Sequence, residues 1–144
     1  MADLWKLVPR DFEANLQYRI DIRKRADRDL GFRKTLLAAS KHDFIFWLSA
    51  FCWLYEPRPR KRNGKLLPKT IPFIPWEHQI PVIQEIRANL GFNPIGLTKS
   101  RGEGASWLAD YLALHDWIFE IEAKVGLVSN TEKKTDDPGN LDSL

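Results

Sequence analysis

Cysteine and histidine are scarce in this sequence. Its 144 residues include a single cysteine, Cys52, and three histidines that lie far apart: His42, His78 and His115. One cysteine cannot form an internal disulfide, and the sequence contains no zinc-site spacing of cysteine and histidine. We therefore expect Cys52 to be a buried thiol in a reducing compartment, and the histidines to be surface or partly buried side chains rather than metal ligands.

Long apolar runs are also lacking. The longest, residues 44–55, spans twelve residues and contains Ser49, whereas a helix that crosses a bilayer needs about 20. The chain starts with Met1-Ala2-Asp3, and no basic stretch precedes an apolar one, so no signal peptide is predicted. We expect a soluble, cytoplasmic protein without a membrane partner.

Acidic residues are missing from one segment of the chain. The net charge is only +3, with a pI near 9.1, which by itself does not indicate a nucleic acid partner. Residues 57–69, however, contain no Asp or Glu and six cations: Arg58, Arg60, Lys61, Arg62, Lys65 and Lys69. Asn63-Gly64 predicts a tight turn among them. The segment suits contact with a DNA phosphate backbone; a merely exposed hairpin loop is the alternative interpretation.

The N-terminal segment is predicted to be helical. Residues 11–29 form the first helix, with Asp11 as its N-cap and its apolar face at Phe12, Leu16 and Ile20. Its cations alternate with acids, as on a solvated helix face: Arg19, Arg23, Lys24, Arg25 and Arg28. DNA contact by these residues is the less favoured interpretation.

Two further helices are expected before the basic segment. Gly31 is predicted to end the first helix, and a second helix follows at about 32–40. The third helix, at about 43–55, has Asp43 as its N-cap and carries so many aromatic residues that it should be buried on most sides.

The second half of the chain is predicted to alternate strands and helices. An extended piece at 69–74 precedes a helix within about 76–90, and Pro81 indicates that this helix starts late, near His78 or Gln79. A strand at 95–97, a helix at 105–122 and a strand at 124–129 then make one right-handed βαβ unit.

Between that strand and helix lies the layout of a phosphate-binding loop. The candidate phosphate-contacting residues are Lys99, Ser100, Arg101, Gly102, Glu103, Gly104, Ala105 and Ser106. The glycines permit close backbone approach, and Ser106 stands where a Mg²⁺-binding hydroxyl belongs. The usual motif ends in Gly-Lys-Ser/Thr, whereas here the lysine, Lys99, is at the front. From spacing alone, nucleotide binding and a plain glycine turn stand about equal.

Three stretches together carry a family resemblance. They are residues 99–108 (KSRGEGASWL), residues 73–79 (FIPWEHQ), and an aromatic stretch that starts DFIFWL at Asp43 and ends YEPR at Arg58. The combination resembles the ATPase half of large terminase subunits, the DNA-packaging motors of tailed bacteriophages and prophages, over about residues 40–142. In that family a deviant Walker A motif has its lysine at the front of the loop.

The resemblance implies a role for each matching residue. Lys99 would be the phosphate-binding lysine, Arg101 a basic loop residue, and Ser106 the hydroxyl associated with Mg²⁺. Gln79, with Trp76, would recognise adenine. The implied fold is α/β, with a helical N-terminal segment (1–68) followed by residues 69–144 as the first βαβ part of a P-loop NTPase (ASCE-type) fold.

The resemblance also implies cofactors and partners. These are ATP and Mg²⁺, double-stranded phage DNA and, for a full-length family member, the small terminase subunit, the portal and a ring oligomer in the bacterial host cytoplasm. The family continues to a Walker B acid pair, a catalytic glutamate and a nuclease domain, which this chain lacks. We therefore expect a fragment, with no catalytic residues and negligible ATP hydrolysis on its own.

Two other functions stay open at this point. One is a helicase-like P-loop ATPase with a glutamine motif. The other is a small non-enzymatic DNA-binding or interaction protein whose glycine turn is structural.

Overall fold

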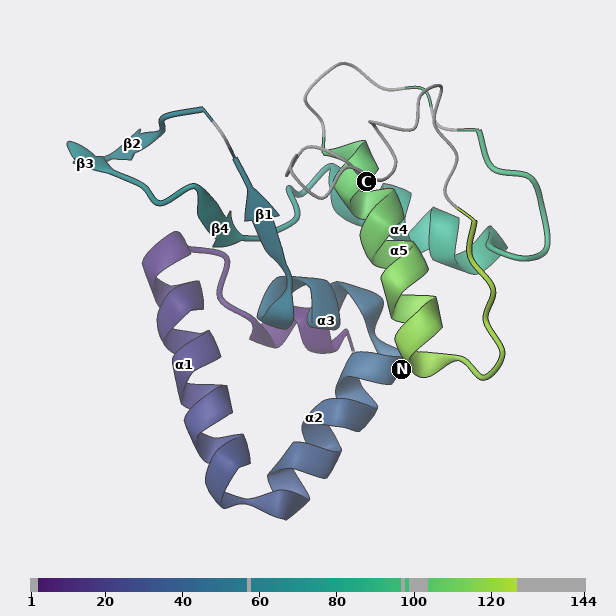
Figure 1. Ribbon diagram of the computed structural model, residues 1–144, viewed down its shortest axis with the longest axis horizontal. Coiled ribbons are helices and arrows are strands. Elements are labelled where there is room, and N and C mark those ends of the chain that lie inside the picture. The colour runs from purple at the N-terminus through teal and green to yellow at the C-terminus, as the bar shows by residue number, and fades with distance from the viewer. Residues whose placement is uncertain (1–2, 57, 97, 99–103, 127–144) are drawn as a thin grey trace. The chain divides into compact units, whose positions relative to one another are not determined.

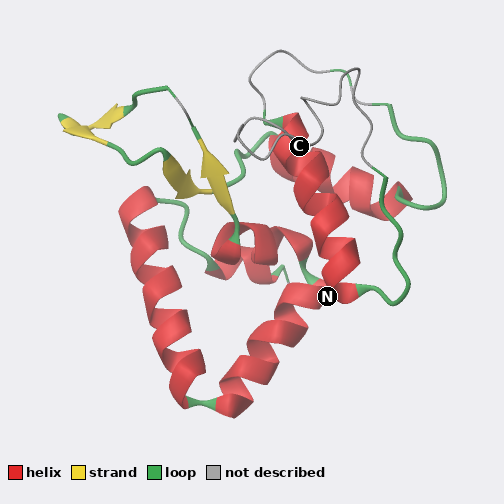
Figure 2. Ribbon diagram, viewed as in Figure 1, coloured by secondary structure: helices red, strands yellow, loops and turns green. Residues whose placement is uncertain are grey.

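The computed structural model describes residues 3–56, 58–96, 98 and 104–126, most of which are helical (Figure 2). The elements in chain order are η1 (Leu4–Leu7), α1 (Phe12–Arg28), α2 (Leu30–His42), α3 (Phe44–Phe51), β1 (Trp53–Tyr55), β2 (Lys61–Arg62), β3 (Lys65–Leu66), β4 (Thr70–Pro72), α4 (Gln79–Asn89) and α5 (Ala105–Phe119) (Figure 1). The fold is mixed α/β, as predicted. Its described strands form two antiparallel pairs, β1 with β4 and β2 with β3.

The chain divides into two units, Met1–Glu103 and Gly104–Leu144. The first contains the described elements from η1 to α4, and the second contains α5. The predicted boundary between residues 68 and 69 falls inside the first unit, where β4 pairs with β1. The segment that follows residue 69 is therefore tied to the strand that directly follows the three N-terminal helices.

Three aspartates start the first three helices. Asp11, Asp29 and Asp43 each accept a hydrogen bond from the backbone N–H three residues ahead, at 2.8–3.1 Å, which stabilises each helix by about 1 kcal/mol. The predicted caps Asp11 and Asp43 are confirmed. The predicted helix end at Gly31 is wrong, because Asp29 leaves the helical conformation (φ −125°, ψ 102°) and so ends α1 and starts α2.

The core of the first unit lies among η1 and the first three helices. Its buried centre consists of Val8, Ile22, Phe46 and Ala50, and partly buried side chains of α2 pack against it: Phe32, Leu36 and Ala39. All residues from 44 to 50 are buried, so the prediction that the third helix is enclosed on most sides is confirmed.

The buried face of α1 is not the predicted apolar one. Asn15, Arg19 and Ile22 are buried, whereas Ile20 is 46% exposed. The Arg19 guanidinium donates three hydrogen bonds, to the Asn15 Oδ1 at 2.6 Å, the Ser49 carbonyl at 2.6 Å and the Cys52 carbonyl at 2.9 Å. Arg19 is therefore enclosed in the core and is not part of a DNA-contacting surface.

These bonds complete the C-terminal end of α3. The last carbonyls of a helix have no intrahelical donor, and a cation there also complements the helix dipole. The Ser49 carbonyl accepts from both Arg19 and the Asn15 amide (3.2 Å). The helix stops at Phe51, so the prediction of helix to Tyr55 is wrong. Residues 53–55 instead form β1, in the register Trp53↔Pro72, Leu54↔Ile71 and Tyr55↔Thr70.

The helices of the second half form where predicted, but the parallel strands do not. α4 begins at Gln79, and α5 begins at Ala105 and ends at Phe119, three residues early. Ile95, Gly96 and residues 124–126 belong to no strand. Ile95 is 41% and Val125 47% exposed, which does not fit buried parallel strands. Leu97 and residues 127–129 lie outside the described residues, so the predicted βαβ unit is not formed by the described parts of these runs.

We expect Arg19→Ala to lower the free energy of unfolding by about 3 kcal/mol, because it removes three charge-assisted hydrogen bonds from buried acceptors. Arg23→Ala, at an exposed position of the same helix, should change it by no more than about 0.5 kcal/mol. Urea unfolding followed by circular dichroism measures both. Equal stabilities of the two variants would contradict the structural role of Arg19.

Candidate functional site

The predicted phosphate-binding loop is described at its C-terminal end. Lys99, Ser100, Arg101, Gly102 and Glu103 lie outside the described residues. Gly104 is the N-cap of α5 and has a left-handed backbone (φ 68°, ψ 16°), which a residue with a Cβ adopts only at a cost. Ala105 and Ser106 are the first two residues of α5, and Ser106 is exposed.

The start of α5 differs from the starts of α1, α2 and α3 in its N-cap, and in the described residues it resembles the start of α4, which also has no capping side chain. Among the described residues no side chain caps α5, and its first turn contains no acid. The first N–H groups of a helix have no intrahelical acceptor, and the helix dipole adds partial positive charge there. This end of α5 therefore has the properties that favour binding of an anion such as phosphate.

One face of α5 is a packing face. Leu108, Leu112 and His115 are buried, at helical spacing. The Trp107 and Tyr111 rings stack with their centroids 6.1 Å apart. Ser106 takes part in neither of these two features, and its side chain is exposed.

The predicted adenine-binding residues, Gln79 and Trp76, are in contact. The backbone N–H of Trp76 donates to the side-chain Oε1 of Gln79 at 2.8 Å, and the backbone N–H of Gln79 donates to the Trp76 carbonyl at 2.9 Å. Trp76 is 51% exposed, and the His78 ring lies 5.5 Å from it, centroid to centroid. The sequence predicts a surface or partly buried side chain for His78 but does not predict this ring contact with Trp76.

This turn is anchored from the N-terminal side of the chain. The Arg10 Nη2 donates to the carbonyl of buried Pro75 at 2.7 Å. Gln79 and Trp76 belong to the first unit, and Gly104, Ala105 and Ser106 to the second. The structure thus brings Gln79 and Trp76 into contact within the first unit, and it separately places Gly104, Ala105 and Ser106 at the start of α5 in the second.

The cationic segment forms a hairpin, which we call the basic hairpin (residues 58–69). Asn63 and Gly64 have positive φ values of 50° and 75°, as the two-residue turn between β2 and β3 requires. The register pairs Lys61 with Leu66 and Arg62 with Lys65. The predicted Asn-Gly turn is confirmed.

Two of the five predicted DNA-contacting residues are paired with acids. The Arg58 guanidinium donates to both carboxylate oxygens of Glu56, at 2.8 and 3.0 Å, and this hydrogen bonding lowers the pKa of Glu56 to about 2. The Arg62 Nη2 lies 2.5 Å from the Asp11 Oδ2 and 3.7 Å from the Glu13 Oε2. The pKa of Asp11 is lowered first by its hydrogen bond from the Ala14 N–H and then by Arg62.

The other cations of the basic hairpin face solvent. Arg60, Lys61 and Lys65, predicted as DNA contacts, are exposed, as is Lys69. Within the part of the chain that the structure describes, none of the four forms an ion pair. They are the cations available to an external anion.

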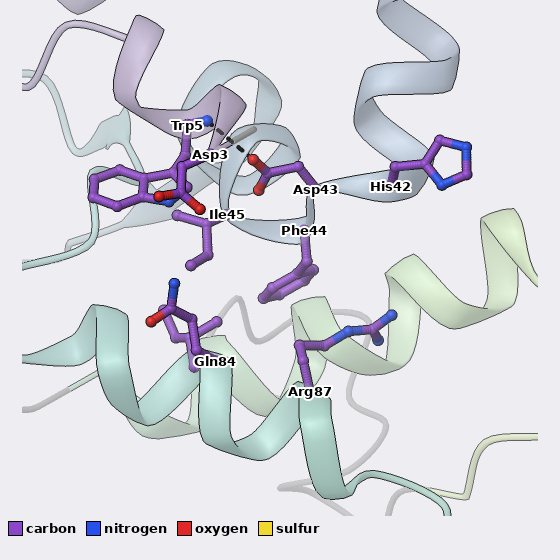
Figure 3. A pocket seen from close by; sticks show the side chains of 9 residues that line it. Asp3, Trp5, His42, Asp43, Phe44, Ile45, Gln84 and Arg87 are labelled. Atoms are coloured by element: carbon purple, nitrogen blue, oxygen red, sulfur yellow. Dashed lines mark hydrogen bonds between the residues drawn. The ribbon is translucent and has the colours of Figure 1, made fainter. Parts of the chain in front are cut away.

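A separate cavity of about 240 Å³ lies in the first unit (Figure 3). It is lined by Asp3, Trp5, His42, Asp43, Phe44, Ile45, Ile83, Gln84 and Arg87. Its acidic groups have partners in the fold, since Asp43 accepts from the Trp5 N–H at 3.0 Å and Asp3 pairs with Lys6 at 2.6 Å. Of its lining residues, the sequence predicts a structural role for Asp43 as a helix cap but does not predict the cavity.

The described residues contain neither a metal-binding cluster nor a membrane-spanning helix. Within 3–56, 58–96, 98 and 104–126, no three His, Cys, Asp or Glu side chains form a group that could hold a metal ion. Cys52 is buried, as predicted, and burial raises the pKa of its thiol. None of the described helices combines the length and the apolar character needed to cross a bilayer.

Comparison with known proteins adds no relative. The chain matches no protein-family model, no curated protein and no solved structure.

Proposed function

We propose that this chain is the ATP-binding portion of a terminase-type DNA-packaging motor. The observation that carries the proposal is the start of α5. The exposed Ser106 lies in the first turn of a helix that no described side chain caps and that directly follows the left-handed Gly104. This is the arrangement by which a P-loop presents backbone N–H groups and a hydroxyl to a nucleotide.

The chain offers residues for each part of Mg²⁺-ATP. Lys99 and Arg101 are the loop cations that would neutralise the phosphates, and the Ser106 hydroxyl would coordinate Mg²⁺. Trp76, with its half-exposed indole, and Gln79 would recognise the adenine. Bound Mg²⁺ would supply charge neutralisation at the phosphate oxygens. A helix start with no acid in its first turn, and no capping side chain among the described residues, is compatible with this cofactor.

The proposed macromolecular partner is double-stranded DNA. The basic hairpin provides four exposed cations for phosphate contacts. As part of a full-length motor of this family in the cytoplasm of a bacterial host, the chain would also work with a small terminase subunit and a portal, in a ring. A helicase-like P-loop ATPase would use the same loop and glutamine.

A second candidate function is a non-enzymatic DNA-binding protein. A P-loop sheet would require strands at Ile95, Gly96 and residues 124–126. These described residues belong to no strand, which favours the second function. The basic hairpin does not depend on that sheet. Under this function the turn at Gly104 is structural, and the chain binds DNA without binding nucleotide.

Lys99→Ala should weaken the binding of a non-hydrolysable ATP analogue by about tenfold or more, since it removes a charge-assisted contact to phosphate. Titration calorimetry with Mg²⁺ present measures the affinity. Lys124→Ala, which removes the same charge at an exposed position after α5, is the control and should bind as the wild type does. Equal affinities of the two variants would exclude Lys99 from the site, and no binding even by the wild type would favour the non-enzymatic function.

Gly104→Ala should lower the free energy of unfolding by about 1–2 kcal/mol, because it places a Cβ on a left-handed backbone. It should also weaken binding of the ATP analogue, because it distorts the loop. Gly96→Ala is the matched control, since its Cβ would meet no atom within 4 Å. Chemical unfolding and the same titration report the two effects. A Gly104→Ala variant as stable as Gly96→Ala would contradict the left-handed helix start.

A further inference from the structure

The six cations of the basic hairpin fall into two groups. Arg58 and Arg62 are paired with acids of the same unit, although the Arg58 side chain is 78% exposed, while the exposed Arg60, Lys61, Lys65 and Lys69 form no ion pair among the described residues. The two arginines differ in what they hold. Arg58 pairs with Glu56, two residues away, whereas Arg62 joins the hairpin to Asp11, 51 residues away in sequence.

Several contacts converge on Arg62. Besides Asp11 at 2.5 Å and Glu13 at 3.7 Å, its guanidinium lies 5.6 Å from the centre of the Phe12 ring. All three partners lie at the start of α1, where Asp11 is also the N-cap. Only 35% of the Arg62 side chain is exposed. Arg62 is thus directed at the start of α1.

A two-stranded hairpin needs such a support. β2 and β3 have two residues each, and an isolated hairpin of this kind is marginally stable in water. Its cations also repel one another. The Glu56 N–H, which donates to the Lys69 carbonyl, closes the base of this hairpin, and the Arg62 contacts join its β2 strand to the start of α1.

We propose that Arg62 is a positioning residue, which holds the basic hairpin against the start of α1 so that Arg60, Lys61, Lys65 and Lys69 contact the phosphates of double-stranded DNA. The proposal rests on the DNA partner of the proposed function, and it divides the predicted DNA-contacting residues into contacts and a support. Charge complementarity identifies the partner, since the four exposed cations lie in a segment with no acid.

The test compares two neutralised acids on α1. Asp11→Asn keeps an N-cap, because asparagine caps as well as aspartate, but it removes the ion pair with Arg62. Charge alone predicts tighter DNA binding, since the variant loses a negative charge and releases an arginine. The proposal predicts the opposite, a weakening of about two- to fivefold, the size expected of an exposed ion-pair cluster.

Asp27→Asn is the matched control, because it removes the same charge from an exposed position of α1. It should bind a random-sequence duplex as tightly as the wild type or slightly more tightly. Fluorescence anisotropy with a labelled duplex measures the affinities, and circular dichroism shows that each variant is folded. Asp11→Asn binding as tightly as Asp27→Asn, or more tightly, would overturn the proposal.

Salt dependence separates contacts from the support. Four phosphate contacts predict a slope of log K against log salt of about −3.6. Lys61→Gln or Lys65→Gln should each lower the magnitude of this slope by about 0.9. Arg62→Gln should weaken binding and leave the slope near that of the wild type. If the slope for Arg62→Gln lost as much magnitude as the slope for Lys61→Gln, Arg62 would be a direct phosphate contact and the proposal would be overturned.

Two further measurements distinguish the possible failures. Poly-glutamate that competes as well as DNA at equal charge would indicate an acidic protein partner and overturn the choice of DNA. ATP-analogue titration of the same variants tests the proposed function separately. If the wild type binds no nucleotide while the Asp11 and Arg62 variants behave as expected, the ATPase proposal fails and the positioning role of Arg62 stands. If nucleotide binding is intact but Asp11→Asn binds DNA more tightly, the positioning role fails and the ATPase proposal stands.

Discussion

The hydrogen bonds of a buried arginine determine the arrangement of the first unit. A charged side chain is costly to bury unless its donors are satisfied, and Arg19 satisfies them on Asn15 and on the carbonyls of Ser49 and Cys52. Those two carbonyls are at the C-terminal end of α3. The same interaction therefore attaches α1 to α3 and lets the helix end at Phe51, so that β1 can begin at Trp53, whose ring lies 4.8 Å from the guanidinium.

The hairpin region depends on that helix end. The Cys52 carbonyl that accepts from Arg19 also accepts from the Phe73 N–H at 3.0 Å, just beyond β4. On the other side, the Glu56 N–H donates to the Lys69 carbonyl at 2.7 Å and closes the base of the basic hairpin. A change at Arg19 would thus be transmitted through β1 and β4 to the segment that carries the exposed cations. The core and the proposed DNA-contacting surface are linked by consecutive backbone bonds.

The features predicted correctly from sequence are those with local causes. Asp11 and Asp43 as caps, the Asn63-Gly64 turn and the start of α4 near Gln79 each follow from residues within one turn of the chain. The burial of Arg19, by contrast, depends on carbonyls 30 and 33 residues away, and helical charge patterning cannot reveal it. The pairing of residues 53–55 with β4 is non-local in the same way. At the candidate site, the contact of Gln79 with Trp76 is local, whereas the ion pair of Arg62 with Asp11 is not.

Arginine has three different roles in this chain, and the groups within reach of each guanidinium decide which. Arg19 meets carbonyls and an amide in the core, Arg62 meets carboxylates at a helix start, and Arg60 meets solvent. Aspartate shows the same dependence on surroundings. α1, α2 and α3 each begin with an aspartate cap, so their N–H groups are satisfied within the protein. α5 begins with a left-handed glycine and no such cap among the described residues, so its N–H groups remain suited to an external anion. A helix start without a side-chain cap among the described residues, and cations without an ion pair there, are thus the two features on which the proposed phosphate contacts rest.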